Sequence, residues 1–174
     1  MNLRPAAALA ALLVASTGLA LAQQMSADIN RISASGVGEK IGTVTVTEGK
    51  EGVSLKVSVK GLPAAPRGFH VHEKGDCGPG MKDGKMEAGI AAGEHYDPEG
   101  HRSHKGPEGN GHKGDLPLLK GNAGGIEETV VAPRLKLADV RGRSLMIHEG
   151  GDNYSDSPEN GGGKGRVACG VVPK

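Results

Sequence analysis

The clearest alternation of apolar and polar positions in this chain lies between residues 40 and 61. Val44 and Val46 alternate with threonines, and after an interruption at 48–52 the apolar residues of 53–59 alternate with serines and lysines. A period of two places every second side chain on the same face of a β-strand, and a break that contains glycine allows the chain to reverse. We therefore predict a β-hairpin with one buried face.

Shorter apolar runs predict further strands, which are separated by two long segments without any apolar period. The strands are expected at Ala27–Ser33, Gly68–Glu73, Glu128–Ala132, Ser144–His148 and Arg166–Val172. Residues 74–122 and 149–164 are instead dense in Gly, Pro, Asp and Lys, which is typical of irregular loops. Long loops inside a compact domain are uncommon and usually functional, so the site is expected there.

The composition supports one domain built from strands and excludes two classes of partner. Thirty glycines and ten prolines in 174 residues favour strands and turns over long helices. With no Trp, one Phe and two Tyr, the core is expected to consist mostly of Val, Leu, Ile and Ala. The formal net charge of +1 excludes the broad basic surface of a nucleic-acid-binding protein. No apolar run is long enough to span a membrane.

The first residues have the order of a secretory signal. A single charge at Arg4 precedes ten uninterrupted apolar residues, Ala6–Ala15, and a small-residue stretch then ends in an A-x-A sequence at Ala22. We predict a signal peptide at 1–22 and a mature domain at 23–174. An amphipathic or membrane-anchoring helix is the alternative, but ten apolar residues are too few to cross a bilayer.

Export changes the interpretation of the two cysteines, Cys77 and Cys169. In an oxidising compartment an even number of cysteines usually forms disulfides. These two lie 92 positions apart, and closing so long a loop stabilises a fold by about 4–5 kcal/mol in the chain-entropy model. Two free buried thiols or a thiolate metal site are the alternatives.

Three of the seven histidines lie on expected strands. His70 and His72 are two positions apart, so they point to the same side of a strand and both rings can reach one metal ion. By itself such a pair is more often two surface histidines. His148 ends the apolar segment 145–147 and, taken alone, is more often a structural histidine.

The other histidines are concentrated in the first long loop. His95, His101, His104 and His112 are followed by Asp115, all within 21 positions. Three imidazoles and a carboxylate supply the nitrogen and oxygen donors of a tetrahedral zinc site, and a bound metal would also order so polar a loop. A solvated histidine-rich tract is the alternative. The spacing predicts one or two metal sites without saying which histidine serves which.

Five segments, in the same order along the chain, resemble a known family. Gly68–Glu73 (GFHVHE) and Gly165–Gly170 (GRVACG) are similar to the two signature segments of the copper,zinc superoxide dismutases. Residues 92–98 (AGEHYDP), 111–117 (GHKGDLP) and 148–154 (HEGGDNY) resemble its bacterial, exported branch in particular. The resemblance extends from about Ala27 to Val172. It implies an all-β fold, an eight-stranded Greek-key β-barrel or sandwich with two long functional loops.

The resemblance also implies a set of site residues and two cofactors, one copper ion and one zinc ion per chain. The implied ligands are His70, His72, His95 and His148 for copper, and His95, His104, His112 and Asp115 for zinc. His95 would be shared by the two ions. Asp152 would link the copper ligand His70 with the zinc ligand His104. Cys77 and Cys169 match the family disulfide, and His101 matches no ligand and is interpreted as an exposed loop residue.

The implied reaction converts two superoxide anions and two protons into molecular oxygen and hydrogen peroxide by Cu(II)/Cu(I) cycling. Arg166 would hold superoxide beside the copper, and His95 would supply a proton. The implied enzyme is a monomer or homodimer that protects an exported compartment, the periplasm, from superoxide.

The sequence departs from the family pattern at three positions. Glu94 stands where Gly is common, Lys113 stands where Leu is more usual, and His101 adds a competing donor. None of these changes removes a ligand, so they put the rate in question rather than the activity. The alternatives to a dismutase are a non-catalytic copper or zinc carrier and a zinc hydrolase.

Overall fold

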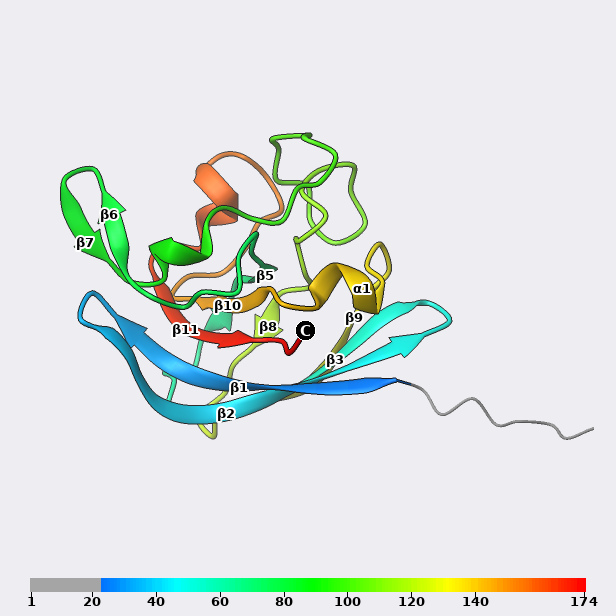
Figure 1. The fold of residues 1–174 in the computed structure, drawn as a ribbon, viewed down its shortest axis with the longest axis horizontal. Helices are drawn as coiled ribbons and strands as arrows, with labels where there is room; N and C mark the ends of the chain where they lie inside the picture. Colours follow the sequence, from blue (N-terminus) through cyan, green and yellow to red (C-terminus); the bar gives the residue numbers. More distant parts are fainter. Residues whose placement is uncertain (1–22) are drawn as a thin grey trace, which may run out of the picture.

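The computed structural model describes residues 23–174, so the expected signal peptide at 1–22 lies outside the described residues. Seven strands form one antiparallel sheet in the order β5-β10-β11-β1-β2-β3-β9 (Figure 1). Their bounds are β1 Gln24–Ser33, β2 Gly36–Gly49, β3 Gly52–Val59, β5 Phe69–Val71, β9 Ile126–Ala132, β10 Ser144–His148 and β11 Arg166–Val171. Within this described part, no helix has the length and apolar character needed to cross a membrane.

Two short strands close the curled sheet into a barrel. β4 (Pro66–Arg67) pairs with β8 (Leu119–Lys120), and β8 also lies beside β9. Because only Gly68 separates β4 from β5, these two are one interrupted strand, and eight strands then surround the core. The neighbours β3 and β9, and β1 and β11, are not consecutive, so long connections cross the barrel ends as in a Greek key. The expected fold class is confirmed.

The strongest sequence pattern forms the hairpin that was predicted from it. β2 and β3 pair so that Val44 faces Val57 and Val46 faces Leu55, and all four side chains are fully buried. The intervening threonines, serines and lysines alternate to the outer face, as the period of two requires. Burial of these paired aliphatic side chains is therefore the reason that this register is selected.

The core is aliphatic, as the composition predicts. The fully buried large side chains include Phe69, Leu145 and Ile147 from β5 and β10, and Leu116 and Leu119 from the end of the first long loop. The two loop leucines anchor that loop to the barrel. A short helix, α1 (Leu137–Val140), connects β9 to β10 and contributes both of its terminal side chains to the same core.

The first long segment is not wholly irregular, which corrects one expectation. Residues 74–122 contain a projecting hairpin, β6 (Gly80–Lys82) and β7 (Lys85–Glu87), a 3₁₀ turn η1 (Ile90–Ala92), and β8. The hairpin was missed because its side chains are mostly exposed, so no buried face imposes an alternation. The second segment, 149–164, contains only the 3₁₀ helix η2 (Glu159–Gly162).

Candidate metal centre

Buried nitrogen and oxygen donors form two adjoining clusters on the outer face of β5. The ligand-capable atoms lie within 4.8 Å of one another in each cluster: His70, His72, His95 and His148 in one, and His70, His95, His104 and Asp115 in the other. His95, the ligand that the resemblance implies is shared, belongs to both clusters, and so does His70. His112, expected in the second cluster, is replaced there by His70, whose ring stacks on that of His95 with centroids 3.9 Å apart.

β5 and β10 place the first group of histidines. His70 lies on β5 opposite Met146 of β10, His72 follows directly after β5, and His148 ends β10. The side chains of Phe69 and Val71 enter the barrel core, so by the alternation of a strand His70 and His72 point outward together. The long loops cover this outer face, and the three rings are at most 4 % exposed.

The first long loop returns along β5 and brings its own donors beside these histidines. Tyr96 donates its backbone N–H to Val71 O at 2.8 Å, and Val71 donates to Gly114 O at 2.9 Å. Isolated bridge pairs consequently place His95 opposite His72 and Asp115 opposite His70. Backbone pairing therefore positions the loop donors, which the spacing of histidines in the sequence does not reveal.

Three imidazole nitrogens converge on one oxygen of Asp115. The distances from Asp115 Oδ1 are 3.1 Å to His95 Nδ1, 2.9 Å to His104 Nδ1 and 3.5 Å to His112 Nδ1. Asp115 Oδ2 is held separately, because it accepts hydrogen bonds from the backbone N–H groups of Lys105 and Gly106. His112 thus lies beside the second cluster, and the four residues offer the three nitrogens and one oxygen that a zinc ion accepts.

Unpartnered buried nitrogens show that the residues fit metal ions. Four imidazoles of the first cluster each leave one nitrogen without a hydrogen bond: His70 Nδ1, His72 Nε2, His95 Nε2 and His148 Nε2. A buried polar atom without a partner costs about 1–3 kcal/mol, so such atoms are rare unless a ligand uses them. Four nitrogens suit Cu(II), which favours a tetragonal nitrogen environment.

One carboxylate, that of Asp152, holds the second ring nitrogen of both His70 and His104. His70 Nε2 lies 2.8 Å from Asp152 Oδ2, and His104 Nε2 lies 2.7 Å from Asp152 Oδ1. The side chain of Asp152 is fully buried, and the backbone N–H of Tyr154 also donates to it at 2.8 Å. This single carboxylate therefore fixes the orientation of one ring from each cluster.

The electrostatics keep Asp115 and the imidazoles of the first cluster in the forms that bind metals. Burial, followed by the charges of neighbouring histidines, lowers the pKa of His70 and His72 well below the usual value and that of His148 to about 3. Burial opposes ionisation of Asp115, but hydrogen bonds from His104 and two further histidines outweigh it and lower the pKa of this carboxyl. Neutral imidazoles and an ionised carboxylate are the required metal ligands.

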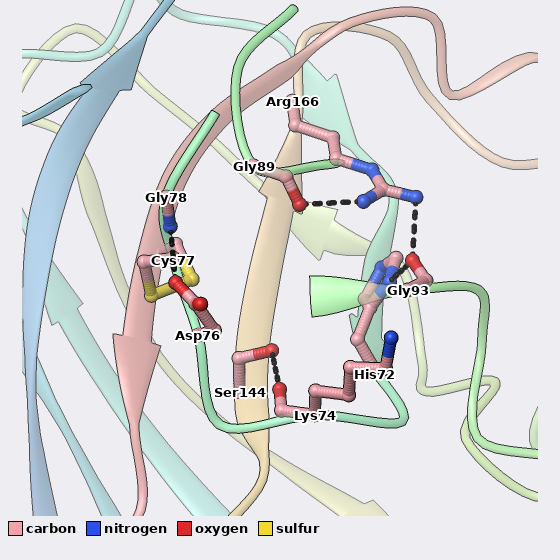
Figure 2. The surroundings of a disulfide bond; sticks show 10 residues. His72, Lys74, Asp76, Cys77, Gly78, Gly89, Gly93, Ser144 and Arg166 are labelled. Carbon is pink, nitrogen blue, oxygen red and sulfur yellow. Dashed lines mark hydrogen bonds between the residues drawn. A yellow bond between two sulfur atoms is a disulfide. The ribbon is translucent and has the colours of Figure 1, made fainter. Parts of the chain in front are cut away.

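A backbone loop tied down by the disulfide holds Arg166 beside the first cluster (Figure 2). Arg166 Nη1 donates to Gly89 O at 2.7 Å and Nη2 donates to Gly93 O at 2.9 Å. Gly93 O also accepts a hydrogen bond from His72 Nδ1 at 2.9 Å, so one carbonyl positions both groups. These two carbonyl groups were not foreseen, because acceptors on the backbone leave no signal in the residue type.

The disulfide between Cys77 and Cys169 is present, with Cα atoms 5.7 Å apart, which confirms the predicted pairing. It connects the start of the first long loop to β11, the strand that begins with Arg166. Ala91 donates its backbone N–H to Gly78 O at 3.1 Å, so the loop segment that carries Gly89 and Gly93 is attached next to the disulfide.

Two adjoining cavities open over the site. One, of about 290 Å³, is lined by His148, Arg166 and Lys164 together with acidic side chains. The other, of about 540 Å³, is lined by His95 and His112 among others. Glu94, Glu159 and Asn160 line both cavities. A small anion can therefore reach Arg166 and the first histidine cluster from solvent.

Each departure from the family pattern has a definite place. Glu94 is exposed between the two cavities. Lys113 Nζ forms a half-buried ion pair with Asp139 Oδ2 of α1 at 2.9 Å. His101 belongs to neither cluster, but the expectation that it is exposed is wrong. Its side chain is only 22 % exposed, because Asp97 and Glu99 enclose the ring at 3.5 Å.

Comparisons with known proteins agree with this fold and identify a family. The sequence model of the family "Copper/zinc superoxide dismutase (SODC)" matches residues 40–172. Superoxide dismutase [Cu-Zn] of Brucella abortus biovar 1 (strain 9-941) is 55 % identical over 140 residues, covering 79 % of this chain and 81 % of that protein. The Escherichia coli (strain K12) protein of the same name is 47 % identical over 163 residues, covering 92 % and 94 %.

Solved structures show the same similarity. Cu/Zn superoxide dismutase from Brucella abortus superposes with a TM-score of 0.84 at 51 % identity, covering 86 % of this chain and 99 % of that one. The monomeric copper, zinc enzyme from Salmonella enterica superposes with a TM-score of 0.77 at 48 % identity, with the same coverage. The barrel and its paired histidine clusters define a metal-dependent oxidoreductase with two adjacent ions. Within that class, the chain belongs to the copper/zinc superoxide dismutase family, in its bacterial form.

Proposed function

We propose that the two histidine clusters and Arg166 together convert two superoxide anions and two protons into molecular oxygen and hydrogen peroxide. The observation that carries this proposal is the position of His95. Its Nε2 is an unpartnered nitrogen of the first cluster, and its Nδ1 lies 3.1 Å from Asp115 in the second. One imidazole thus offers a nitrogen to each of two adjacent ions.

We assign the ions by the chemistry of the donors. Copper takes the four unpartnered nitrogens of the first cluster, on His70, His72, His95 and His148. Zinc takes Nδ1 of three histidines and Oδ1 of the carboxylate that they surround, on His95, His104, His112 and Asp115. When bound, copper supplies the one-electron transfers to and from superoxide, while zinc has no redox chemistry.

Arg166 binds the substrate anion. Two of its N–H groups are used by the carbonyl groups of Gly89 and Gly93, and this leaves other N–H groups of the guanidinium for superoxide. A hydrogen bond between a cationic donor and an anion is roughly twice as strong as a neutral one. The fixed guanidinium therefore orients superoxide beside His148 in the cavity.

His95 handles one of the two protons. Its Nε2 would hold a proton only while it is not bound to copper; that proton would be transferred to the anion bound at Arg166, and solvent in the cavity would supply the other proton. Asp152 does not touch the substrate; it keeps His70 and His104 in the orientation that leaves Nδ1 of each ring for the metal.

We also propose that the protein is exported to the periplasm and that the signal peptide is removed, leaving residues 23–174. The mature protein is a monomer or a homodimer. The apolar segment at 6–15, the disulfide and the bacterial relatives support export. N-terminal sequencing of the exported protein should begin at Gln23. An N-terminus at Met1 in the periplasmic fraction would contradict cleavage.

The substitution Arg166→Ala tests the catalytic assignment. With copper and zinc content matched to the wild type by mass spectrometry, kcat/KM for superoxide should fall by about tenfold or more, since about 1.4 kcal/mol of anion stabilisation is lost. Arg166→Lys, which keeps the charge without the planar fork, should lose less. Full turnover in the metal-loaded Arg166→Ala protein would refute the role of Arg166.

Two other functions make different predictions for the wild type. A metal carrier with filled sites would show no superoxide decay above background in stopped-flow measurements. A zinc hydrolase needs an open zinc position, but His95, His104, His112 and Asp115 already supply four donors to the zinc.

A further inference from the structure

Two methionines lie side by side on the surface of the projecting hairpin. Met81 of β6 is directly opposite Met86 of β7 in the register, and their side chains are 61 % and 50 % exposed. Met146, by contrast, is fully buried in β10. The two surface thioethers contribute little to a core, so packing does not explain why they are methionines.

The turn brings these two side chains close together. Asp83 and Gly84 form the two-residue loop, both with positive φ, as a tight hairpin turn requires. Lys82 and Lys85 close the turn as a hydrogen-bonded pair, so the next pair, Met81 and Met86, is the non-hydrogen-bonded kind, in which side chains approach most closely. Their Cβ atoms are then about 4.5–5.5 Å apart, and flexible thioethers at that spacing can bind one ion from two sides.

The donor type selects the ion. Thioether sulfur is a soft, uncharged donor that prefers Cu(I) to zinc, magnesium or calcium, and it is not protonated at any ordinary pH. Both cysteines of the chain are used in the disulfide, so methionines are the sulfur donors that remain. Hard divalent cations need anionic oxygen ligands, which a pair of thioethers does not supply.

The hairpin is also next to the copper-side cavity. Its strands project from the barrel at the side of Figure 1 where β6 and β7 are labelled. Because side chains alternate along each strand, Lys82 and Glu87 point to the face opposite the methionines, and both line the cavity that contains Arg166. The methionine pair therefore lies on the outer side of the wall of the substrate cavity.

We propose that Met81 and Met86 together bind one Cu(I) ion at the surface, at a site separate from the histidine centre. The site goes beyond the proposed dismutase function, which does not use these residues. Its ligand is the reduced form of the metal that the family requires as a cofactor, held by two neutral sulfur atoms.

A competition titration with Cu(I) tests the site in the fully metallated protein. Copper and zinc first fill the histidine centre, and Cu(I) is then added without oxygen as a complex with a chromophoric chelator. The wild type should withdraw one further Cu(I) per chain, with copper–sulfur scattering in its X-ray absorption spectrum. Met81→Leu/Met86→Leu should withdraw none, and each single variant should bind at least about tenfold more weakly, a loss of about 1.4 kcal/mol.

Leucine keeps the apolar surface and removes only the sulfur, so the variants separate metal binding from apolar contact. Met25→Leu, on β1, is the matched control and should bind as the wild type does. Mass spectrometry before the titration confirms that the thioethers are not oxidised. The proposal is overturned if the wild type takes up no further Cu(I), or if the double variant takes up as much. Superoxide decay by the double variant should equal that of the wild type, so failure here leaves the dismutase assignment untouched.

Discussion

Each copper-side imidazole uses one ring nitrogen to keep its orientation and leaves the other without a partner. The acceptors that hold these rings differ: a buried carboxylate for His70, and a backbone carbonyl for His72. Because hydrogen bonding at one nitrogen decides which tautomer is present, these acceptors determine the nitrogen that is offered to the metal. The acceptors are therefore as necessary as the ligands.

Asp152→Asn should weaken both metal sites. An amide has one acceptor oxygen, so it can no longer accept from both His70 and His104, and its NH₂ group faces one ring nitrogen instead. Loss of such an outer partner typically costs 10–100-fold in metal affinity, and we expect that range here. Chelator competition measures it, and Asp28→Asn, in a surface ion pair with Lys40, is the control. Unchanged affinity at both sites would show that Asp152 is not needed for positioning.

Glu94→Gln should increase the rate of superoxide capture. The Glu94 carboxylate lines the same cavity as Arg166 and repels an incoming anion, while hydrogen bonds between the Glu94 backbone and Glu73 keep this segment in place. We expect kcat/KM to rise about two- to threefold at low ionic strength and the difference to vanish at high salt, which screens the charge. Pulse radiolysis over a salt series measures this. Glu99→Gln, on an exposed part of the loop, should change nothing, and an equal rise in both variants would contradict the argument.

At the scale of elements, two long loops without a core of their own are held in four ways. The first loop pairs with β5 through backbone hydrogen bonds and inserts Leu116 and Leu119 into the barrel. It is linked to the second loop, since His104 donates its backbone N–H to Asp156 at 2.6 Å. The disulfide then attaches its beginning to β11.

Removal of the disulfide in Cys77→Ser/Cys169→Ser should reduce stability and activity separately. We expect a loss of about 2–5 kcal/mol in the free energy of unfolding, because the unfolded chain gains entropy when a long loop is opened. Activity per bound copper should also fall, because the loop that carries Gly89 and Gly93 no longer holds Arg166 firmly. Urea unfolding and superoxide decay at matched metal content measure the two effects. Wild-type activity per copper would mean that the loop holds Arg166 without the disulfide.

At the scale of the whole molecule, a barrel of aliphatic side chains supports a centre that is costly to bury without metal. Burial and neighbouring histidines lower the pKa of His70, His72 and His148, so these rings are neutral in the folded protein and must gain protons on unfolding in acid. His104 behaves in the opposite way. Burial lowers its pKa, but hydrogen bonds to Asp115 and Asp152 outweigh burial and raise it to about 9.

The metal-free protein should therefore be most stable at about pH 6.5, losing stability as the pH falls below this value and, through His104, as the pH rises toward about 9. A histidine whose pKa is lowered by folding contributes stability above its unfolded pKa of about 6.5, and this is lost as the pH falls; several such rings outnumber His104. The contribution of His104 is complete below about pH 6.5 and is lost as the pH rises through about 9. Urea unfolding of chelator-treated protein from pH 4 to 10 measures the profile. A flat profile below pH 6.5 would contradict the neutral buried histidines.

Much of the fold was predictable because one barrel face is apolar. All seven strands of the main sheet were expected, since alternation reports burial directly, although β2 begins at Gly36 rather than near Lys40. The two-residue strands β4 and β8 were not expected, because they are too short to show an alternation. The β6–β7 hairpin was not expected, because two exposed faces need no apolar period. Because this hairpin shows no apolar alternation, the sequence did not indicate that Met81 and Met86 lie opposite each other.

The amino-acid sequence by itself determined the donor types, the buried faces of the strands and the family resemblance, because these depend on residue identity and local spacing. Only the tertiary structure decided which ring nitrogen of each copper-side histidine has no hydrogen-bond partner. It also decided that Gly93 O accepts hydrogen bonds from both His72 and Arg166, and that Glu94 lines the substrate cavity. Those features arise where segments distant in the chain meet, and local spacing carries no information about such meetings.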